Sequence, residues 1–343
     1  MDRSDAIRDQ IAILSKVEGF FEASVMFALL RLDLFEAIGQ RTGSISQLSR
    51  KTGADAGRLG RLLRCAATME FLESPDGEHF RLSKPTRTVL LKGSPDYYMG
   101  DWLHFLSTLY GVFGELDKAV LGENPVIDLA AEFETKLGAA GSFNRAMDTY
   151  ARLRGRELAD YLDLTGSTSL LDLGCGPGTY AYHLALRNSQ LELFLADLPS
   201  VIKQTSRLPQ WRDLDNPINY IPLDILEDEL PGSYDVILIS NTLHMLGHQE
   251  SQKLIGHLFP RVKTGGSLVV QAQFLGTGGV GHRWPAILDL IMLCGSQRGE
   301  NHSVEATTAW LRETGFTDIE HCPLSLLNTN SYLRAHKPVL SHS

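Results

Sequence analysis

The sequence predicts an α/β protein whose doubly wound parallel sheet follows an N-terminal, mostly helical winged-helix domain. Its 343 residues exceed one ordinary domain and suffice for two. In the second half of the chain, apolar strand-like runs alternate with helical stretches, which is the pattern of a doubly wound sheet. The first such run leads into a loop with glycine at every second position, Gly174, Gly176 and Gly178. We therefore expect two domains, residues 1–100 and residues 101–343.

The N-terminal domain begins with helices that lack a strongly polar face. Apolar residues recur at helical spacing between Ile7 and Ile38, for example in GFFEASVMFALLRLDLFEAIG. Helices of this kind are buried in a core or against a partner molecule. We therefore expect them to pair in a homodimer.

The next segment has the order of a winged helix. Ser44 is the expected N-cap of a short helix that Gly53 breaks, and a second helix covers about residues 56–69. The Asp76-Gly77 pair then predicts the turn of a hairpin. Helix, turn, helix and hairpin together make a winged helix.

Winged helices often bind DNA, and this defines an alternative function as a regulator. Residues 44–90 carry eight basic and five acidic side chains, which is a weak electrostatic footprint for DNA. The formal charge of the whole chain is −9, which disfavours nucleic acid and anionic membranes as main partners. We therefore favour dimerisation as the role of this domain.

The C-terminal domain is predicted to hold five strands with helices between them. A helical connector and a long amphipathic helix that includes the FNRAM segment precede the first strand. Two more strands follow the helix VEATTAWLRETG in close succession, and we expect one antiparallel strand at the sheet edge. The five predicted strands are residues 169–173, 191–196, 219–223, 235–240 and 267–271.

The glycine loop does not match the common phosphate-binding fingerprints. The dinucleotide pattern needs a third glycine where Thr179 stands, and the Gly-Lys-Ser/Thr of a Walker loop is absent. The loop contains no lysine or arginine that could meet a pyrophosphate. Asp197 ends the next strand, where a carboxylate can hold ribose hydroxyls, and Asp224 follows the third strand near an adenine edge. S-adenosylmethionine (SAM), a nucleoside with an amino-acid tail, fits this set best; a purely structural turn is the alternative.

The chain resembles the small-molecule O-methyltransferases of the hydroxyindole, caffeate and bacterial polyketide type. The resemblance covers nearly the whole chain, and the order and spacing of its motifs are more specific than any single motif. The matching segments are DLFEAIG, ISQLSRKTG, RLGRLLRCAATMEFL, FNRAM, LLDLGCGPG, ADLPSVI, PLDI, ISNTLHMLGHQES, GGSLVV and WLRETGF.

The resemblance implies methyl transfer from SAM to a hydroxyl of a small, aromatic or secondary-metabolite acceptor. It also implies a dimer in which the N-terminal domains exchange helices and help to close the partner's substrate pocket. The implied cofactor contacts are Gly174 to the methionine part, Asp197 to ribose, and Asp224 with Ile225 around adenine. The neighbouring residues Gly176, Leu198 and Ser240 complete the expected cofactor site.

By the same resemblance, the catalytic candidate is His244 in the stretch NTLHMLGHQE. Relatives place a histidine there to deprotonate the acceptor. A phenol with a pKa of about 10 is a poor nucleophile at neutral pH, and an imidazole with a pKa of about 6.5 can accept its proton during the attack. His248, four residues later, is expected to be a solvated residue at the start of a helix.

The chain departs from the family pattern at three places around this histidine. Met245 stands where an acid usually follows, and Ser240 stands where a lysine or arginine near the cofactor is common. Asn301 and His302 replace a Glu-Arg pair whose glutamate supports the catalytic histidine. Glu300 is adjacent and is a candidate substitute, and Asn301→Asp is expected to restore an orienting acid.

Two further reactions remain as alternatives. His244 and His302 could bind iron or zinc in a C-methyltransferase that acts on a keto acid, although the missing acid at Met245 disfavours a metal site. A SAM-dependent enzyme of non-methylating chemistry is the second alternative. We expect no metal.

Aromatic and methionine side chains suit a flat, apolar acceptor. The candidate pocket residues are Trp102, Phe105, Phe143, Met147, Trp284, Met292 and Asn301.

The composition predicts a cytoplasmic location. The four cysteines are scattered without a Cys-x-x-Cys pair, as is typical of reduced thiols. The first ten residues lack the apolar segment of a secretion signal, and no apolar run reaches the roughly 18 residues that a membrane span needs.

Overall fold

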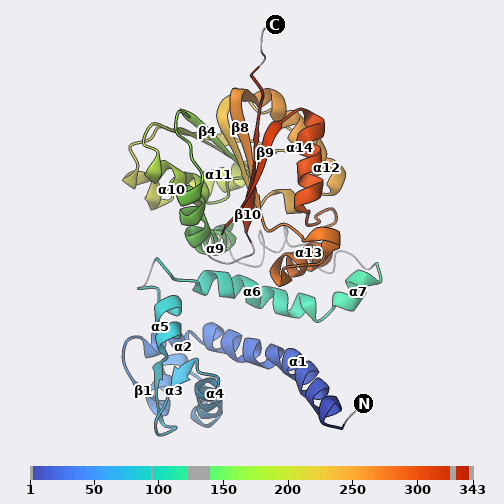
Figure 1. The fold of residues 1–343 in the computed structure, drawn as a ribbon. Helices are drawn as coiled ribbons and strands as arrows, with labels where there is room; N and C mark the ends of the chain where they lie inside the picture. Colours follow the sequence, from blue (N-terminus) through green and yellow to red (C-terminus); the bar gives the residue numbers. More distant parts are fainter. Residues whose placement is uncertain (1–2, 94–95, 123–139, 325–329, 340–343) are drawn as a thin grey trace. The chain divides into compact units, whose positions relative to one another are not determined.

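The computed structural model of the chain describes residues 3–93, 96–122, 140–324 and 330–339 (Figure 1). The chain divides into two compact units, residues 1–107 and residues 108–343. The division lies within helix α6 (Gly100–Phe113), whereas the sequence places the domain boundary at the start of this helix.

The first unit is a small helical domain with a three-stranded sheet. Its core is formed by apolar side chains from the C-terminal end of α1, from α2 to α5 and from the hairpin. The strands pair in the order β1-β3-β2. The elements before α6 are α1 (Arg3–Arg31), α2 (Leu34–Ile38), β1 (Gly43–Ser44), α3 (Ile45–Thr52), α4 (Ala56–Thr68), β2 (Leu72–Glu73), β3 (His79–Leu82) and α5 (Lys84–Leu90).

The winged-helix elements begin and end where the sequence predicts. Ser44 caps α3 in a capping box with Gln47, since the Ser44 hydroxyl accepts from the Gln47 N–H at 3.3 Å and the Gln47 amide accepts from the Ser44 N–H at 3.0 Å. Gly53 ends the helix in the left-handed conformation, with φ at 73°. The hairpin β2–β3 turns at Asp76-Gly77.

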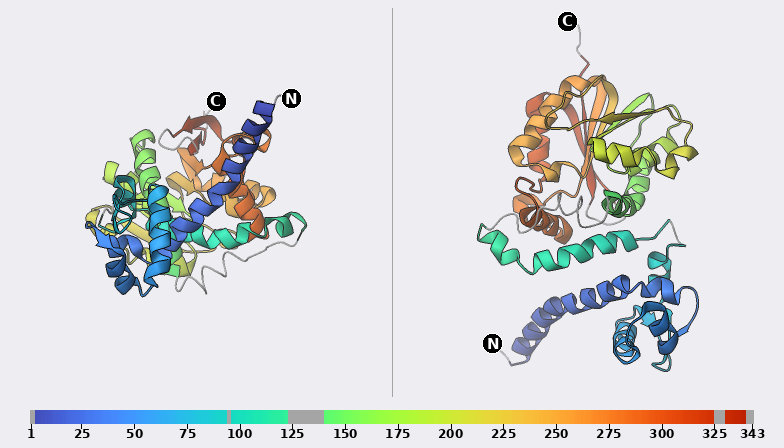
Figure 2. Two further views of the ribbon diagram at one scale, coloured as in Figure 1. Left: turned by 90° about the horizontal axis from the view of Figure 1, so that it is seen from below. Right: turned by 180° about the vertical axis from the view of Figure 1, so that it is seen from behind.

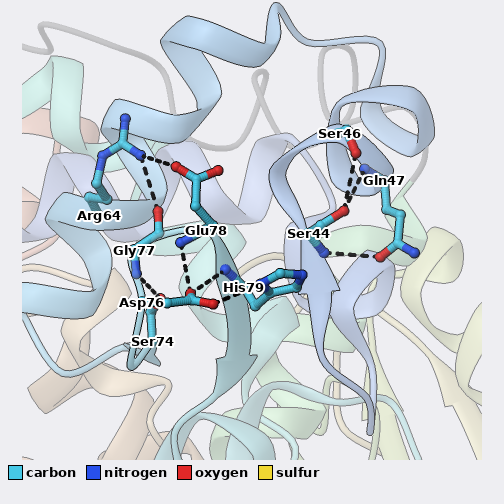
Figure 3. A network of polar contacts seen from close by, with 9 residues as sticks. All are labelled: Ser44, Ser46, Gln47, Arg64, Ser74, Asp76, Gly77, Glu78 and His79. Atoms are coloured by element: carbon cyan, nitrogen blue, oxygen red, sulfur yellow. Dashed lines mark hydrogen bonds and ion pairs between the residues drawn. The ribbon is translucent and has the colours of Figure 1, made fainter.

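Figure 3 shows the capping box at Ser44 and a second hydrogen-bond network around the turn of the hairpin. The Asp76 carboxylate accepts from the backbone N–H groups of Glu78 and His79 at 2.9 and 2.8 Å, and these bonds hold its pKa well below the usual range. The Arg64 guanidinium of α4 donates to the Gly77 carbonyl at 3.1 Å and pairs with Glu78. The hairpin β2–β3, which is the wing of the winged helix, is therefore hydrogen-bonded to α4. This is the helix that would contact the bases in a DNA-binding winged helix.

The second unit is built on a seven-stranded mixed sheet with the order β6-β5-β4-β7-β8-β10-β9. The five strands from β6 to β8 in this order pair in parallel, and the order reverses between β4 and β7, where the chain changes direction across the sheet. The strands are β4 (Ser169–Leu173), β5 (Glu192–Asp197), β6 (Ile218–Pro222), β7 (Tyr234–Ser240), β8 (Val262–Ala272), β9 (Thr317–Pro323) and β10 (Ser331–His336).

Two apolar cores cover the two faces of this sheet. One core packs α9, α10 and α11 against one face, and the other packs α12 and α14 against the opposite face. The right view of Figure 2 shows this arrangement from behind, with green helices on one side and orange to red helices on the other. The helices are α7 (Leu116–Val120), α9 (Ala140–Tyr161), α10 (Thr179–Arg187), α11 (Pro199–Thr205), α12 (His248–Leu258), α13 (Arg283–Gly295) and α14 (Val304–Thr314).

The α/β fold with an N-terminal helical region is therefore confirmed, with one difference at the edge of the sheet. The antiparallel strand is β10, which inserts between β8 and β9, and β9 forms the edge. The sequence signals two successive strands, but their order across the sheet depends on the long-range pairing of β10 with β8. Among the described residues, no helix combines the length and apolar character needed to cross a membrane.

Candidate active site

The glycine loop joins β4 to α10 and lies at the carboxyl edge of the parallel strands. Gly174, Gly176 and Gly178 have φ angles of 70°, 52° and 70°, a conformation that L side chains rarely adopt. A Cβ at Gly174 would lie 2.7 Å from the Thr242 side chain, and a Cβ at Gly178 would lie 2.6 Å from the Trp211 ring. Glycine is therefore needed here both for the backbone conformation and for space.

Asp197 ends β5 beside this loop. One carboxylate oxygen accepts from the Gly176 N–H at 2.8 Å, and the other accepts from the Leu198 N–H at 2.7 Å. Burial raises the pKa of Asp197, and the two backbone N–H groups oppose this effect. Leu198 itself is 44% exposed, which leaves an apolar side chain open to a ligand next to the carboxylate.

Asp224 and Ile225 follow β6 in a tight turn. The Asp224 carboxylate accepts from the Leu226 N–H at 2.9 Å, and Asp228 accepts from the Asp224 N–H at 2.8 Å. Asp224 is half-buried, and Ile225 packs against one core of the sheet. The Leu223 N–H donates to the Asp197 carbonyl, so the turn is anchored to the end of β5.

Polar contacts from residues 205–211 hold the backbone of the glycine loop, and the sequence did not predict them. The Thr205 hydroxyl donates to the Gly176 carbonyl at 2.6 Å, and the Gln210 amide donates to the Pro177 carbonyl at 3.1 Å. The Trp211 indole N–H donates to the Thr205 carbonyl at 2.7 Å. These contacts come from a segment with no sequence motif, so only the tertiary structure reveals them.

Asp172, which lies within β4, was also not predicted from the sequence. Its side chain is almost fully buried, and burial raises its pKa to about 7. The Ala181 backbone N–H opposes this effect, and the Asp197 carboxylate adds to it. A carboxyl group in an otherwise apolar strand, in LLDLGCG, is a sequence signal that could have identified it.

The end of β7 is fixed by an amide network. Ser240 is buried and pairs in register with Gln271 of β8. Asn241 then takes a left-handed conformation, with φ at 50°, and its amide donates to the Tyr180 hydroxyl at 2.9 Å and to the Gln271 side chain at 2.8 Å. Asn241 was also missed, because its role depends on its backbone conformation.

His244 follows in the short 3-10 turn η2 (Leu243–Met245) and is half-buried. Burial lowers its pKa to about 4, and the nearby His302 imidazole lowers it as well. The ring is therefore neutral at pH 7 and can accept a proton. Met245, beside it, is 48% exposed. In the described part of the chain, no carboxylate forms a hydrogen bond with the His244 ring.

Glu300, the candidate acidic partner of His244, and the adjacent Asn301 form hydrogen bonds with other residues. The Glu300 carboxylate accepts from the His248 backbone N–H at the start of α12. The Asn301 amide donates to the carbonyl groups of Gln273 and Pro285 at 2.8 and 3.0 Å. The expectation that Asn301→Asp supplies an orienting acid is therefore corrected, because a carboxylate at residue 301 would face two carbonyl oxygens.

His248 is exposed at the start of α12, as the sequence predicts, and it also makes a ring contact that the sequence did not predict. Its backbone begins α12, but its ring lies against Trp310, with ring centroids 4.6 Å apart. The Trp310 indole N–H donates to Nε2 of His248 at 3.2 Å. His248 therefore belongs to the contacts between α12 and α14.

Two family models match the chain. Residues 131–317 match the O-methyltransferase domain, and residues 14–90 match the O-methyltransferase dimerisation domain. The first match alone covers more than half of the chain. The chain belongs to the O-methyltransferase family. It is a SAM-dependent O-methyltransferase, as the sequence predicts.

Relatives and solved structures agree with this assignment. The 3-hydroxy-5-methyl-1-naphthoate 3-O-methyltransferase of Streptomyces sahachiroi is 24% identical over 306 residues, which cover 88% of each chain. An O-methyltransferase family protein from Burkholderia thailandensis has the same fold, with a TM-score of 0.84, 20% identity and coverage of 96% of this chain and 98% of its own. Human N-acetylserotonin methyltransferase in complex with SAM gives a TM-score of 0.82, 20% identity and 99% coverage of both chains.

Six of the seven predicted acceptor residues of this methyltransferase, all except Asn301, lie on three helices. Phe143 and Met147 are half-buried on α9, and Trp284 and Met292 lie on α13. Burial raises the pKa of Tyr150 on α9 to about 12, and the neighbouring Arg154 and Trp284 side chains oppose this effect. Trp102 and Phe105 belong to α6 in the first unit, with ring centroids 5.1 Å apart. Their part in an acceptor pocket stays a prediction.

His302 forms hydrogen bonds beneath the turn that carries His244. Its Nε2 atom lies 3.0 Å from the Ser251 hydroxyl and 3.2 Å from the Leu243 carbonyl oxygen. The described residues contain no group of three or more His, Cys, Asp or Glu side chains arranged for a metal ion. These contacts therefore give no support to the metal-dependent alternative.

Proposed function

We propose that this methyltransferase methylates a hydroxyl group of a small aromatic acceptor, with His244 as the general base. One observation carries the proposal: the turn with His244 lies directly against the glycine loop. The Thr242 side chain fills the space where a Gly174 side chain would be, and its hydroxyl lies 3.5 Å from the Gly174 carbonyl oxygen. The base and the methyl donor would therefore meet at one edge of the sheet.

The residues around the loop fit SAM. Gly174 and Gly176 leave backbone open to the methionine part, and the Asp197 carboxylate keeps further lone pairs for ribose hydroxyls. Leu198 and Ile225 offer apolar surface to adenine, and a carboxylate oxygen of Asp224 could accept from its amino group. The buried hydroxyl of Ser240, which has no hydrogen-bond partner in the described part of the chain, completes the proposed cofactor site.

His244 would act during the attack of the acceptor oxygen. When bound, SAM supplies an electrophilic methyl group on its sulfonium. The neutral imidazole accepts the hydroxyl proton while the oxygen–carbon bond forms and the sulfur–carbon bond breaks. The site thus contributes alignment of the two reactants and one proton acceptor.

The acceptor we propose is a hydroxylated aromatic compound such as a hydroxynaphthoate or hydroxybenzoate. The names of two relatives, the naphthoate enzyme above and the 3-amino-4-hydroxybenzoate 4-O-methyltransferase of Streptomyces cremeus, support this class. The half-buried rings of Phe143 and Trp284 suit such an acceptor. The test is incubation with methyl-labelled SAM and a panel of hydroxylated aromatic acids, followed by mass spectrometry of the product. Label on a carbon or nitrogen atom of the product would contradict O-methylation.

We also propose a homodimer formed through the first unit. The N-terminal part of α1 exposes large apolar side chains that are 45–62% accessible in the single chain: Ile7, Ile11, Ile13, Leu14, Val17, Phe20 and Phe21. Such a surface is typical of an interface. The match to a dimerisation domain supports this role.

The wing contacts favour dimerisation over DNA binding. The Arg64 guanidinium is engaged by Gly77 and Glu78, as Figure 3 shows, and Arg81 donates to Glu73 at 2.7 Å. Two of the cations that could contact phosphates are thus paired within the domain. Binding of duplex DNA that falls steeply with salt would contradict this part of the proposal.

A further inference from the structure

A buried hydrogen-bond network lies directly beneath the turn that carries His244. Nε2 of His302 is 3.2 Å from the Leu243 carbonyl oxygen and 3.0 Å from the Ser251 hydroxyl oxygen. The Ser251 hydroxyl in turn lies 3.4 Å from the same carbonyl. Because a carbonyl oxygen can only accept, Nε2 carries the proton and donates.

All members of this network are removed from water. His302 is 6% exposed, Leu243 is 3% exposed, and Ser251 is fully buried. Within the turn, the Leu243 carbonyl also accepts from the backbone N–H of Leu246 at 2.9 Å, so His302 and Ser251 add the contacts that hold this carbonyl from outside the turn. The His302 ring is also held by Trp310, with centroids 5.0 Å apart and ring planes at 79°.

The Leu243 carbonyl belongs to the same peptide group as the backbone nitrogen of His244. A hydrogen-bond donor that holds this carbonyl therefore also holds the peptide plane that precedes the Cα atom of His244. This limits the directions in which the His244 side chain can point. The side chains next to His302 in the sequence serve other contacts, because Glu300 accepts from His248 and Asn301 donates to two carbonyls. In the described part of the chain, the catalytic turn is held through its backbone.

We propose that His302, together with Ser251, is a positioning residue that aims the His244 imidazole through the Leu243 carbonyl. The inference rests on the proposed role of His244 as the base. In the family pattern, a carboxylate at the position of residue 301 orients the catalytic histidine. The proposal assigns this orienting function to His302.

The charged groups around His302 are compatible with this role. Burial lowers the pKa of His302 most, and His248 lowers it as well, while the backbone carbonyls of Leu243 and Leu246 and the nearby Glu300 raise it. The net direction is downward, so the ring is neutral at pH 7 and donates without adding a charge next to His244. A protonated His302 would disfavour protonation of His244.

The test compares His302→Gln, His302→Leu and Ser251→Ala in the full-length protein. Turnover is measured with methyl-labelled SAM and 3-hydroxy-2-naphthoate as the probe acceptor, or another hydroxy acid from the panel if the wild type methylates that one. His302→Leu should lower kcat by about 10–100-fold with unchanged SAM affinity. His302→Gln should keep most of the activity, because its amide can donate to the same carbonyl. Ser251→Ala should lie between the two.

A matched control separates positioning from general destabilisation. His183 is buried on α10, at 7% exposure, outside the proposed machinery, so His183→Leu should lower the melting temperature but leave kcat unchanged. A second readout needs no acceptor: NMR titration of the His244 ring should show a higher pKa in His302→Leu, because the neighbouring imidazole that opposes its protonation has been removed.

Combination with His244→Ala decides between the possible outcomes. If His302 acts through His244, then His302→Leu should cause no further loss in the His244→Ala background. An equal loss in both backgrounds, or equal loss in His302→Gln and His302→Leu with an unmoved His244 titration, would overturn the inference and leave the base assignment intact. Full activity of His244→Ala by itself would instead refute the proposed function.

Discussion

The carboxylate of Asp197 accepts a hydrogen bond of 2.8 Å from the backbone N–H of Gly176, which ties the end of β5 to the middle of the glycine loop. Replacement by alanine removes this bond and the proposed contact with ribose. We expect Asp197→Ala to weaken SAM binding by about 1–3 kcal/mol, measured by calorimetry. The exposed Asp215 of the same unit serves as the control, and Asp215→Ala should bind SAM normally. Normal binding by both variants would remove Asp197 from the cofactor site.

Gly174→Ala should abolish measurable SAM binding. The new Cβ would lie 2.7 Å from the Thr242 side chain, and the φ angle of 70° is itself unfavourable for alanine. Gly256 in the interior of α12 is the control, since a Cβ added there would meet no atom within 4 Å. Gly256→Ala should therefore raise stability by about 0.5–1 kcal/mol with normal binding. Wild-type SAM affinity in Gly174→Ala would show that the loop does not hold the cofactor closely.

Asp172 gives a prediction for the pH dependence of stability. Its pKa is raised from 3.8 to about 7 in the folded protein, so the folded state holds a proton that the unfolded state releases between these values. Its contribution to the free energy of unfolding is thus fully present below pH 4 and is lost as the pH rises towards 7, by at most about 4 kcal/mol. Asp172→Asn should lack this loss. Melting curves of the SAM-free proteins between pH 5 and 8 provide the test, and parallel pH profiles would contradict it.

Phe21 and Val17 lie on the exposed apolar part of α1, and the double variant Val17→Asp/Phe21→Asp should convert the proposed dimer to monomers. Light scattering at micromolar concentration measures the change in mass. Leu186 of α10 is similarly exposed but lies in the second unit, so Leu186→Asp should remain dimeric. A monomeric wild type would disprove the proposed assembly.

Local sequence signals were sufficient for much of the fold. The capping box at Ser44, the left-handed Gly53 and the Asp76-Gly77 turn each depend on a few neighbouring residues, and the structure places them as predicted. The five parallel strands were also recognisable, because buried strands are continuous apolar runs. The position of β10 was not, since its partner β8 lies more than fifty residues earlier in the chain.

The candidate site was predictable only in part. The glycine loop and Asp197 have motifs, and the structure brings them within hydrogen-bond distance. The roles of Asn301 and His302 depend on which carbonyl groups face them after folding, and no local pattern contains this information. The sequence therefore identified which residues surround the turn that carries His244, but not which of them contact it.

The proposed base gives an unusual expectation for the pH profile. His244 must be neutral to accept a proton, and its pKa is lowered from 6.5 to about 4 by burial and by His302. Activity limited by this group should therefore fall only as the pH drops towards 4, and it should not change around pH 6.5. Initial rates between pH 4 and 8 provide the measurement, and a rate that halves near pH 6.5 would contradict the expectation.

The assignment of His244 as the base is tested most directly by two measurements on His244→Ala: SAM affinity by calorimetry, and turnover with the hydroxy acid that the wild type methylates. We expect nearly unchanged SAM affinity, because His244 is outside the proposed cofactor contacts, and turnover lower by about 10²–10⁴-fold, as is typical of the loss of a general base. Turnover close to that of the wild type, with intact SAM binding, would contradict the assignment of His244 as the base.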